Sequence, residues 1–250
     1  PVVPTIHYQM GGIPTNINGQ VVVWDGEKNN VVNGLYAVGE CSCVSVHGAN
    51  RLGTNSLLDL LVFGKSAGKH IVHYVNGYGD HQPMPGDGSD RTLARLNQLQ
   101  DSKDGTYAQD VANDIRASMQ QHAGVFRTQK GMDEGVVKIN AIRDRVASVT
   151  LKDKSKVWNT ARMEALEVDN LIEVAQATMT SAAARKECRG AHTVYDYEHP
   201  ADHPECPLGR NDKEWMKHTL WHSANNNLTY KPVNLKPLAV DSIPPKVRTF

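Results

Sequence analysis

The stretch over residues 34–64, GLYAVGECSCVSVHGANRLGTNSLLDLLVFG, constrains the fold more than any other part of the chain. It opens with a short apolar run, residues 35–38, which Gly39 and Glu40 close. Such a run is typical of a buried strand that ends in a loop-edge carboxylate. Apolar residues then recur from Leu57 onward around most of a helical circumference, which predicts a largely buried helix. The stretch therefore predicts a buried strand joined to a buried helix by a polar loop.

The polar loop over residues 50–55, NRLGTN, has the composition of a binding segment. Ser56 is followed three residues later by Asp59, and this spacing predicts a capping box at the start of the helix. Unpaired backbone amides at a helix start attract negative charge, and Arg51 adds a cation beside them. The loop is thus a candidate anion site, although an ordinary connection with a surface arginine fits the composition equally well.

The remaining composition limits the class of protein. The chain has 250 residues, enough for one large or two modest domains with a core of their own. Its 27 basic and 27 acidic residues balance, so the charge does not favour a nucleic-acid partner. Asp59 and Lys65 interrupt the longest apolar stretch, so no membrane span is predicted. Four cysteines do not make a disulfide framework in a chain of this length, which suits a reducing compartment.

The sequence pattern predicts three units along the chain. Short β-type runs and turn signals before residue 34 predict a small hairpin, and a loop rich in glycine and proline follows over residues 77–88. Apolar residues at helical spacing over residues 89–185 predict three to four helices packed as a bundle. Residues 215–232 predict a second hairpin that turns at the three asparagines from Asn225. The expected domains are residues 1–80, 81–188 and 189–250.

Several motifs resemble one known family. HYQMGGIPTN at residues 7–16, followed by the stretch over residues 34–64, is similar to the flavoprotein subunits of the succinate dehydrogenase and fumarate reductase family. ECRGAH, RNDKEWMKHTL and the ending PPKVRTF are similar to later family segments in the same order. HGANRLG is shared by the fumarate reductases, whereas IPTN and SLLDL are more similar to the succinate dehydrogenase branch. The resemblance covers nearly the whole chain.

The resemblance implies a fold class and a cofactor. The fold is expected to be α/β plus α: the carboxyl-terminal segment of an FAD-binding domain, then a helical bundle and a small C-terminal unit. Family members also carry a glycine-rich unit that holds the FAD pyrophosphate, a histidine bonded to the flavin, and an arginine that carries a proton. No G-x-G-x-x-G motif follows a strand in this sequence. We therefore expect the missing N-terminal part of the same polypeptide to be a partner of this chain, which should not turn over substrate alone.

The resemblance also assigns site residues. His7 and Arg51 match residues that bind the carboxylates of succinate or fumarate, and the forked guanidinium of arginine suits a carboxylate. Glu40, Arg51, Ser56 and Leu57 match contacts to FAD, Glu40 near the ribose and the last two at the pyrimidine side of the flavin. No catalytic residue and no metal ligand is assigned. Without the family, His7 would be interpreted as a satisfied core histidine and Arg51 as a solvated loop residue.

The implied activity is the oxidation of succinate to fumarate, with electrons passing through FAD to an iron–sulfur subunit and quinone. A membrane-anchor pair would hold the complex at the cytoplasmic face of the bacterial inner membrane, or at the matrix side of the mitochondrial one. Three alternatives stay open from the sequence. They are a fumarate reductase flavoprotein, the more remote aspartate oxidase, and a non-catalytic scaffold fragment.

Two groups of cysteine and histidine residues have competing interpretations. His199, His203 and Cys206 are donor types that suit zinc, but only three ligands are obvious and the neighbouring prolines indicate a surface insertion. Cys41 and Cys43 resemble a redox pair, yet one intervening residue on an extended segment directs their side chains to opposite faces. For these two cysteines we expect buried structural thiols.

Three further residues belong to the motifs of the resemblance. His47 lies in the substrate loop, where it either orients Arg51 or simply packs. Arg189 and His192 are part of ECRGAH and are expected to orient the loops between domains as structural support.

Overall fold

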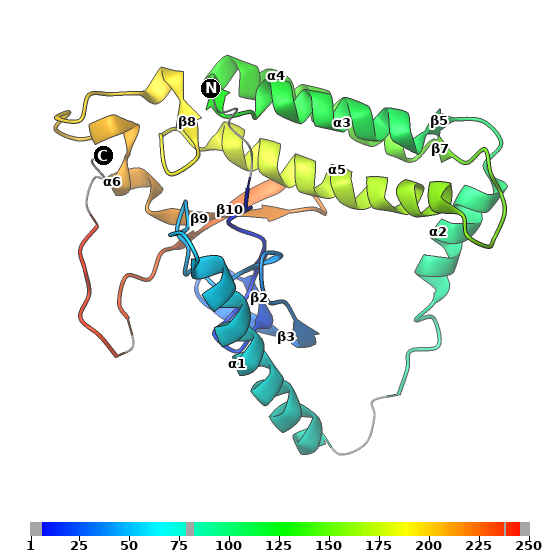
Figure 1. Ribbon diagram of the computed structural model, residues 1–250, viewed down its shortest axis with the longest axis horizontal. Coiled ribbons are helices and arrows are strands. Elements are labelled where there is room, and N and C mark those ends of the chain that lie inside the picture. Colours follow the sequence, from blue (N-terminus) through cyan, green and yellow to red (C-terminus); the bar gives the residue numbers. More distant parts are fainter. Residues whose placement is uncertain (1–6, 79–82, 238, 246–250) are drawn as a thin grey trace.

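The computed structural model describes residues 7–78, 83–237 and 239–245 (Figure 1). An N-terminal α/β unit, a helical bundle and a C-terminal unit with a hairpin follow one another along the chain. The N-terminal elements are β1 (Ile13–Pro14), β2 (Gln20–Trp24), β3 (Asn29–Tyr36), β4 (Ser42–Cys43) and α1 (Asn55–Tyr78). The next are α2 (Asp90–Asp101), β5 (Thr106–Tyr107), α3 (Ala108–His122), β6 (Phe126–Arg127), α4 (Gln129–Val146), β7 (Val149–Thr150) and α5 (Thr160–Ala184). The last are β8 (Thr193–Val194), two short 3₁₀ helices (Tyr195–Tyr197 and Pro207–Gly209), α6 (Asp212–Trp215), β9 (Lys217–His222) and β10 (Asn227–Pro232).

The predicted N-terminal hairpin is confirmed, and it consists of β2 and β3 in antiparallel pairing. Its turn follows from Asp25, whose carboxylate accepts hydrogen bonds from the backbone N–H groups of Glu27 and Lys28. The buried strand expected over residues 35–38 is wrong. β3 starts earlier and ends at Tyr36, and most of its residues are exposed. Within the described residues β3 pairs only with β2, so little covers its other edge.

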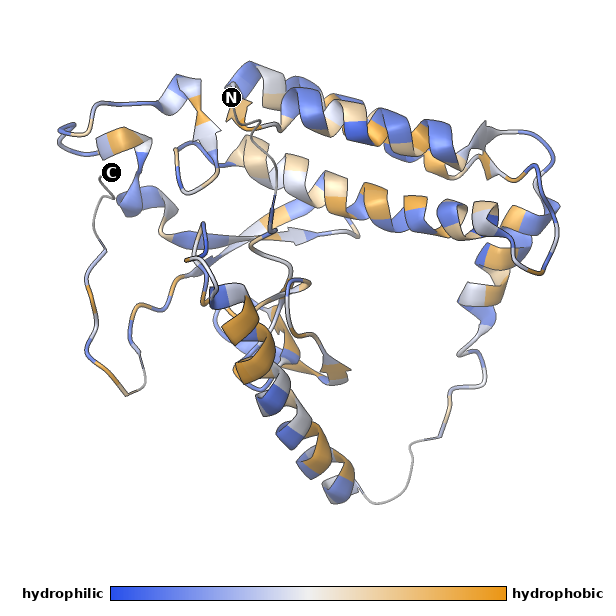
Figure 2. Cartoon of the chain, viewed as in Figure 1, coloured by the Kyte–Doolittle hydropathy of each residue, from blue (hydrophilic) through white to orange (hydrophobic). Residues whose placement is uncertain are grey.

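The prediction that α1 is largely buried is also wrong. Figure 2 shows apolar residues along this helix, and Leu57 and Leu61 are 64% and 71% exposed. Only Asp59 and Ala67 are buried. Among the described residues, α1 contacts the hairpin unit along one narrow side, where the Tyr36 hydroxyl and His70 Nδ1 form a 2.8 Å hydrogen bond. A helix that is apolar on most of its surface is thus covered on a single side.

The start of α1 differs from the predicted capping box. The helix begins at Asn55, so Ser56 lies inside the first turn and is not the cap. The carboxylate of Asp59 does not turn back to cap the backbone but accepts a hydrogen bond from His47 Nε2, at 3.0 Å. This contact joins the segment before the polar loop to the helix that follows the loop.

The predicted helical bundle is confirmed: four helices form, and α3, α4 and α5 lie side by side (Figure 1). The bundle follows from apolar residues at helical spacing, because these residues meet in one core. Thr128 and Asn159 cap the amino ends of α4 and α5, where their side-chain oxygens accept hydrogen bonds from Gly131 N and Arg162 N. The fully buried core side chains include Val111, Ile115, Ile139 and Met179.

The predicted C-terminal hairpin is confirmed as β9 and β10 in antiparallel pairing. Its turn places Asn226 at a φ of 50°, and the Asn226 side-chain oxygen accepts a hydrogen bond from Trp221 Nε1 at 2.7 Å. The hairpin lies beside α5. The domain limits at residues 80 and 188 stay predictions. No helix in the described part of the chain is long and apolar enough to cross a membrane.

Candidate functional site

The two motif segments HYQMGGIPTN and GECSC lie side by side. β1 and β4 pair in parallel with Ile13 opposite Ser42, and Ile13 N donates to the Cys41 carbonyl at 2.9 Å. Gly12 allows this approach, because a Cβ there would overlap the Cys41 carbonyl. Further along the same pair of segments, Gln9 N donates to Glu40 Oε1 at 2.9 Å. The structure therefore brings Glu40 next to the segment that begins with His7.

Tyr8 joins this segment to the polar loop. The Arg51 Cζ lies 4.9 Å from the centroid of the Tyr8 ring, a cation–π contact. The His47 ring lies 5.6 Å from the Tyr8 ring and nearly perpendicular to it, at 77°. His47 Nε2 in turn donates to the Asp59 carboxylate. Arg51, Tyr8, His47 and Asp59 therefore form one contiguous group, which we call the Tyr8 cluster.

Several buried polar atoms of the Tyr8 cluster have no hydrogen-bond partner among the residues that the structure describes. They are His47 Nδ1, Arg51 Nε and Asp59 Oδ1. Leaving a buried polar atom unpaired costs about 1–3 kcal/mol, so their concentration in one cluster points to a polar group that binds there. Of these atoms Arg51 Nε can only donate and Asp59 Oδ1 can only accept, so a carboxylate could pair with Arg51 but not with Asp59.

The carboxylates near Tyr8 affect its hydroxyl. Burial raises the pKa of Tyr8, the Asp59 and Glu40 carboxylates raise it further, and the Arg51 cation opposes this shift. Tyr8 therefore stays a neutral phenol at physiological pH, with an aromatic face toward a cation.

The loop that carries His47 and Arg51 is held from the C-terminal unit. Gly190, at a φ of 59°, packs directly against the carbonyl group of Ala49. Ser45 Oγ and His218 Nε2 form a hydrogen bond of 3.2 Å. Two segments far along the chain therefore set the position of the loop over residues 44–54.

Comparisons with known proteins identify the family. A model described as fumarate reductase flavoprotein C-term matches residues 112–250, and an FAD binding domain model matches residues 1–57. The succinate dehydrogenase flavoprotein subunit of Rickettsia bellii (strain RML369-C) is 46% identical over 256 aligned residues, which cover all of this chain. The chain belongs to the succinate dehydrogenase and fumarate reductase flavoprotein family. The resemblance found in the sequence is therefore confirmed.

One further sequence relative and one solved structure each match nearly the whole of this chain but only about two fifths of their own length. The fumarate reductase flavoprotein subunit of Mycobacterium tuberculosis (strain CDC 1551 / Oshkosh) is 32% identical over the whole chain and 40% of its own length. A solved E. coli quinol fumarate reductase superposes with a TM-score of 0.78 at 32% identity, over 97% of this chain and 39% of that one. The predicted fold class is thus confirmed. This chain spans 41% of the length of the Rickettsia bellii relative.

FAD is the cofactor of this flavoprotein family, as the sequence predicted. The residues present fit it, because the unpaired atoms of the Tyr8 cluster lie next to the start of α1, whose first turn has no acidic residue. The amino end of a helix carries a partial positive charge and favours an electron-rich group. Ser56 in this turn is half-buried, whereas Leu57 is exposed.

The structure brings some of the assigned family site residues together and leaves His7 exposed. Arg51 and Glu40 both reach the segment over residues 7–9, through Tyr8 and Gln9. His7 is exposed and directly precedes Tyr8. The individual ligand roles of these residues stay predictions. Sequence reasoning missed Tyr8 entirely, and it interpreted Asp59 as a helix cap.

The family motif ECRGAH forms structural support, as expected. Arg189 pairs with the buried carboxylate of Glu187 and with Asp212, at 2.7 Å each. Although burial lowers the pKa of Arg189, its hydrogen bonds to these two carboxylates raise it overall. His192 Nδ1 accepts from Arg127 at 2.9 Å, and His192 Nε2 donates to the Arg185 carbonyl. These bonds fix the turn that contains Gly190.

Adding a methyl group at Gly190 is expected to destabilise the flavoprotein. In Gly190→Ala the new Cβ would overlap the Ala49 carbonyl, and overpacking of this kind costs about 1–3 kcal/mol. Gly48→Ala is the matched control, because Gly48 has a similar φ of 61° and no atom of the described residues lies within 4 Å of the place that its new Cβ would take. Urea unfolding of both variants measures the difference. An equal loss of unfolding free energy would show that the contact with Ala49 is unimportant.

Acid should destabilise the C-terminal unit through His192. Burial lowers the pKa of His192 below its usual 6.5, and the nearby Arg127 and Arg185 cations lower it further. As the pH falls from 6.5 through the folded pKa, the unfolded chain binds a proton that the folded state resists, so stability decreases. We expect His192→Gln to reduce this loss in melting temperature between pH 7 and pH 5. His73→Gln, at an exposed histidine, is the control; equal pH profiles for wild type and His192→Gln would refute the assignment.

The structure can be compared with two weaker predictions, the buried thiols at Cys41 and Cys43 and the zinc donors at His199, His203 and Cys206. Cys41 is exposed, so the expectation of two buried structural thiols is wrong for it; Cys43 is half-buried. In the loop between β3 and β4, Ala37 and Gly39 are buried, but Glu40 and Cys41 at its end are exposed. The rings of His199 and His203 stack at 4.3 Å, and His203 Nδ1 accepts from the Cys206 backbone N–H at 3.0 Å. Nothing in the described part of the chain groups three or more residues as a metal site.

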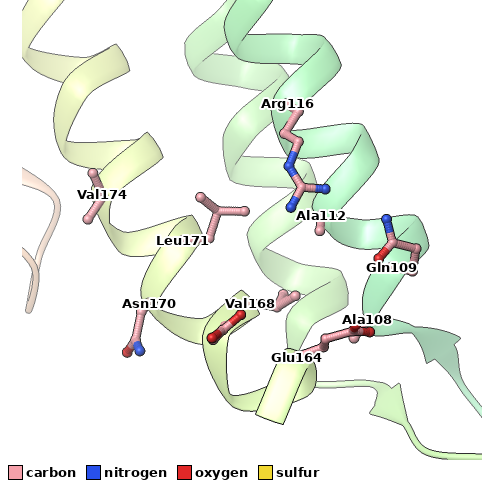
Figure 3. Close-up of a pocket in the computed structure, with 10 residues that line it drawn as sticks. Ala108, Gln109, Ala112, Arg116, Glu164, Val168, Asn170, Leu171 and Val174 are labelled. Atoms are coloured by element: carbon pink, nitrogen blue, oxygen red, sulfur yellow. The ribbon is translucent and has the colours of Figure 1, made fainter. Parts of the chain in front are cut away.

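An open groove of about 490 Å³ lies elsewhere, between α3 and α5 (Figure 3). Gln109 and Arg116 of α3 face Glu164 and Leu171 of α5 across it. Neither helix contributes a candidate site residue of this flavoprotein, so the groove is separate from the Tyr8 cluster.

Proposed function

We propose that this chain is part of a flavoprotein that oxidises succinate to fumarate. The observation that supports this proposal most directly is the Arg51 guanidinium, which lies on the Tyr8 ring beside unpaired buried polar atoms. Among the described residues Arg51 forms no ion pair, so its charge is available to an anionic ligand. A dicarboxylate supplies the oxygens that such a guanidinium binds best.

The residues of this chain act in the reaction by binding and orienting the substrate. Arg51 would hold one carboxylate through forked, charge-assisted hydrogen bonds, and His7 would donate to a carboxylate as well. Fixing both ends of the substrate removes rotational freedom, which can supply a large part of the rate enhancement. FAD, when bound, supplies the hydride acceptor. Glu40, Ser56 and Leu57 would contact this cofactor, and the amino end of α1 would stabilise its reduced form.

The partners follow from the same family membership. We propose that the remainder of the FAD-binding domain, on the same polypeptide, covers the exposed apolar side of α1. Electrons would then pass to an iron–sulfur subunit, and a membrane-anchor pair would hold the assembly at the membrane. The site would lie at the cytoplasmic face of the bacterial inner membrane or at the matrix side of the mitochondrial one.

Reduction of the flavin tests the proposed function. The complete flavoprotein is mixed with succinate without oxygen, and we expect its visible flavin absorbance to bleach. Malonate, which carries two carboxylates, should compete, whereas butyrate, which carries one, should not. Absence of bleaching by succinate, or bleaching by L-aspartate in its place, would refute the proposal.

Fumarate reduction is the second candidate function, because relatives named fumarate reductase match nearly the whole chain at 32% identity. The direction depends on the flavin potential and on the quinone. Steady-state rates in both directions, measured with ubiquinone and menaquinol analogues, distinguish the two. A faster succinate-oxidising rate with ubiquinone is expected for the first proposal.

A further inference from the structure

Arg51 has no carboxylate that could fix its orientation, in the part of the chain that the structure describes. Its long side chain would otherwise sample many rotamers, each with a different position of the guanidinium. The contact that limits this freedom is the Tyr8 ring, 4.9 Å from Arg51 Cζ. The position of the Tyr8 ring therefore determines where the guanidinium lies.

The Tyr8 ring is itself held by His47. The two ring centroids lie 5.6 Å apart at 77°, an edge-to-face geometry that contributes about 0.5–1.5 kcal/mol. Tyr8 lies in an irregular segment before β1, where no strand pairing among the described residues holds it. The aromatic contact with His47 is thus well placed to fix the ring.

Asp59 fixes His47. A carboxylate can only accept, so the 3.0 Å bond places the proton on His47 Nε2 and sets the ring orientation. The side chain of Asp59 is 3% exposed, and it extends from the helix α1, which is a rigid support. A buried charge is costly, so a buried carboxylate with one bonded oxygen implies a specific role for this contact.

We propose that Asp59, His47 and Tyr8 are positioning residues that hold the Arg51 guanidinium in place for the substrate carboxylate. This inference rests on the proposed dicarboxylate function. The contacts form a series: Asp59 on the rigid helix bonds the His47 ring, the His47 ring packs on the Tyr8 ring, and the Tyr8 ring lies against the Arg51 cation. None of the three residues needs to touch the reacting atoms. Their effect should therefore fall on the recognition of the carboxylate group.

Tyr8 provides the most informative variants, because it is half-buried and its loss should leave the fold intact. Tyr8→Phe keeps the ring and is the matched control; Tyr8→Leu removes it. In the complete flavoprotein we expect Tyr8→Leu to raise KM for succinate and Kd for malonate at least tenfold. Tyr8→Phe should stay within twofold. Flavin content and melting temperature should stay near wild type in both variants.

Asp59→Asn tests the other end of the same set of contacts. It keeps the size of the side chain and removes its charge, and we expect KM for succinate to rise at least fivefold. Epistasis with Arg51 separates positioning from a general structural role. The Arg51→Lys background lacks the planar fork, so Tyr8→Leu should change KM less than twofold in it. A general structural effect of Tyr8→Leu would instead raise KM by the same factor in this background as in the wild type.

The outcomes are distinct for the two proposals. If the wild-type flavoprotein binds neither succinate nor malonate, the proposed function is wrong. If the wild type binds both and folded Tyr8→Leu binds them equally well, the positioning proposal is overturned while the function stands. Should Asp59→Asn fail to fold, the Tyr8 pair of variants and the Arg51→Lys background still decide the matter.

Discussion

Arg51→Ala in the complete flavoprotein is expected to abolish succinate oxidation while FAD is retained. Two charge-assisted hydrogen bonds of about 1.5–3 kcal/mol each would be lost, which corresponds to a decrease in kcat/KM of about a hundredfold to ten-thousandfold. Binding and rate should suffer together, since the guanidinium both holds and orients the substrate. Steady-state kinetics with succinate, and the flavin spectrum of the purified variant, measure the two effects.

Two controls sharpen the Arg51 experiment. Arg51→Lys keeps the positive charge but loses the forked geometry, so its activity should lie between that of the alanine variant and the wild type. Arg116→Ala removes an arginine from α3 that bonds Asn113, far along the chain from the site, and should leave kinetics unchanged. Near-normal turnover of Arg51→Ala would remove the basis of the assignment.

Glu187→Gln is expected to lower the free energy of unfolding by about 3–5 kcal/mol. The Glu187 side chain is 0% exposed and accepts hydrogen bonds from Arg185 and Arg189 at 2.7 Å each. It also accepts from the backbone N–H of Asn211, at 2.9 Å. Removing its charge leaves two largely buried guanidinium groups without this compensation. Urea unfolding of the complete flavoprotein measures the loss.

Glu173→Gln is the matched control for Glu187. Glu173 pairs with Arg143 at 2.6 Å, but about a third or more of each side chain is exposed. Pairs of this kind contribute about 0–1 kcal/mol, because solvent screens the charges. A similar loss in both variants would show that burial of Glu187 is not what makes its ion pairs important.

The Glu187 network is connected to the loop of the candidate site. Arg189 directly precedes Gly190, whose backbone packs against Ala49 in the loop that carries His47 and Arg51. A stability loss at Glu187 should therefore be accompanied by weaker substrate binding, even though Glu187 touches no proposed ligand group.

Much of the architecture could be predicted from local patterns. The apolar spacing that includes Ile115, Ile139 and Met179 predicted the bundle. Helical periodicity places such residues on one face of each helix, and burial of that face stabilises the packed helices. The turns at Asp25 and Asn226 were also predictable, because both side chains bond within their own turn. The motifs around Arg51 further indicated the family. Each of these features depends on residues close together in the sequence.

The amino-acid sequence alone thus determined the bundle helices, both hairpins, the family and the FAD cofactor. Only the tertiary structure showed that Tyr8 contacts Arg51, and that Asp59 bonds His47 instead of capping its helix. It also showed that α1 is covered on a single side among the described residues. The physical reason is that periodicity and capping arise from neighbours a few residues apart, whereas these contacts join segments that approach only after folding, and burial depends on everything that surrounds an element.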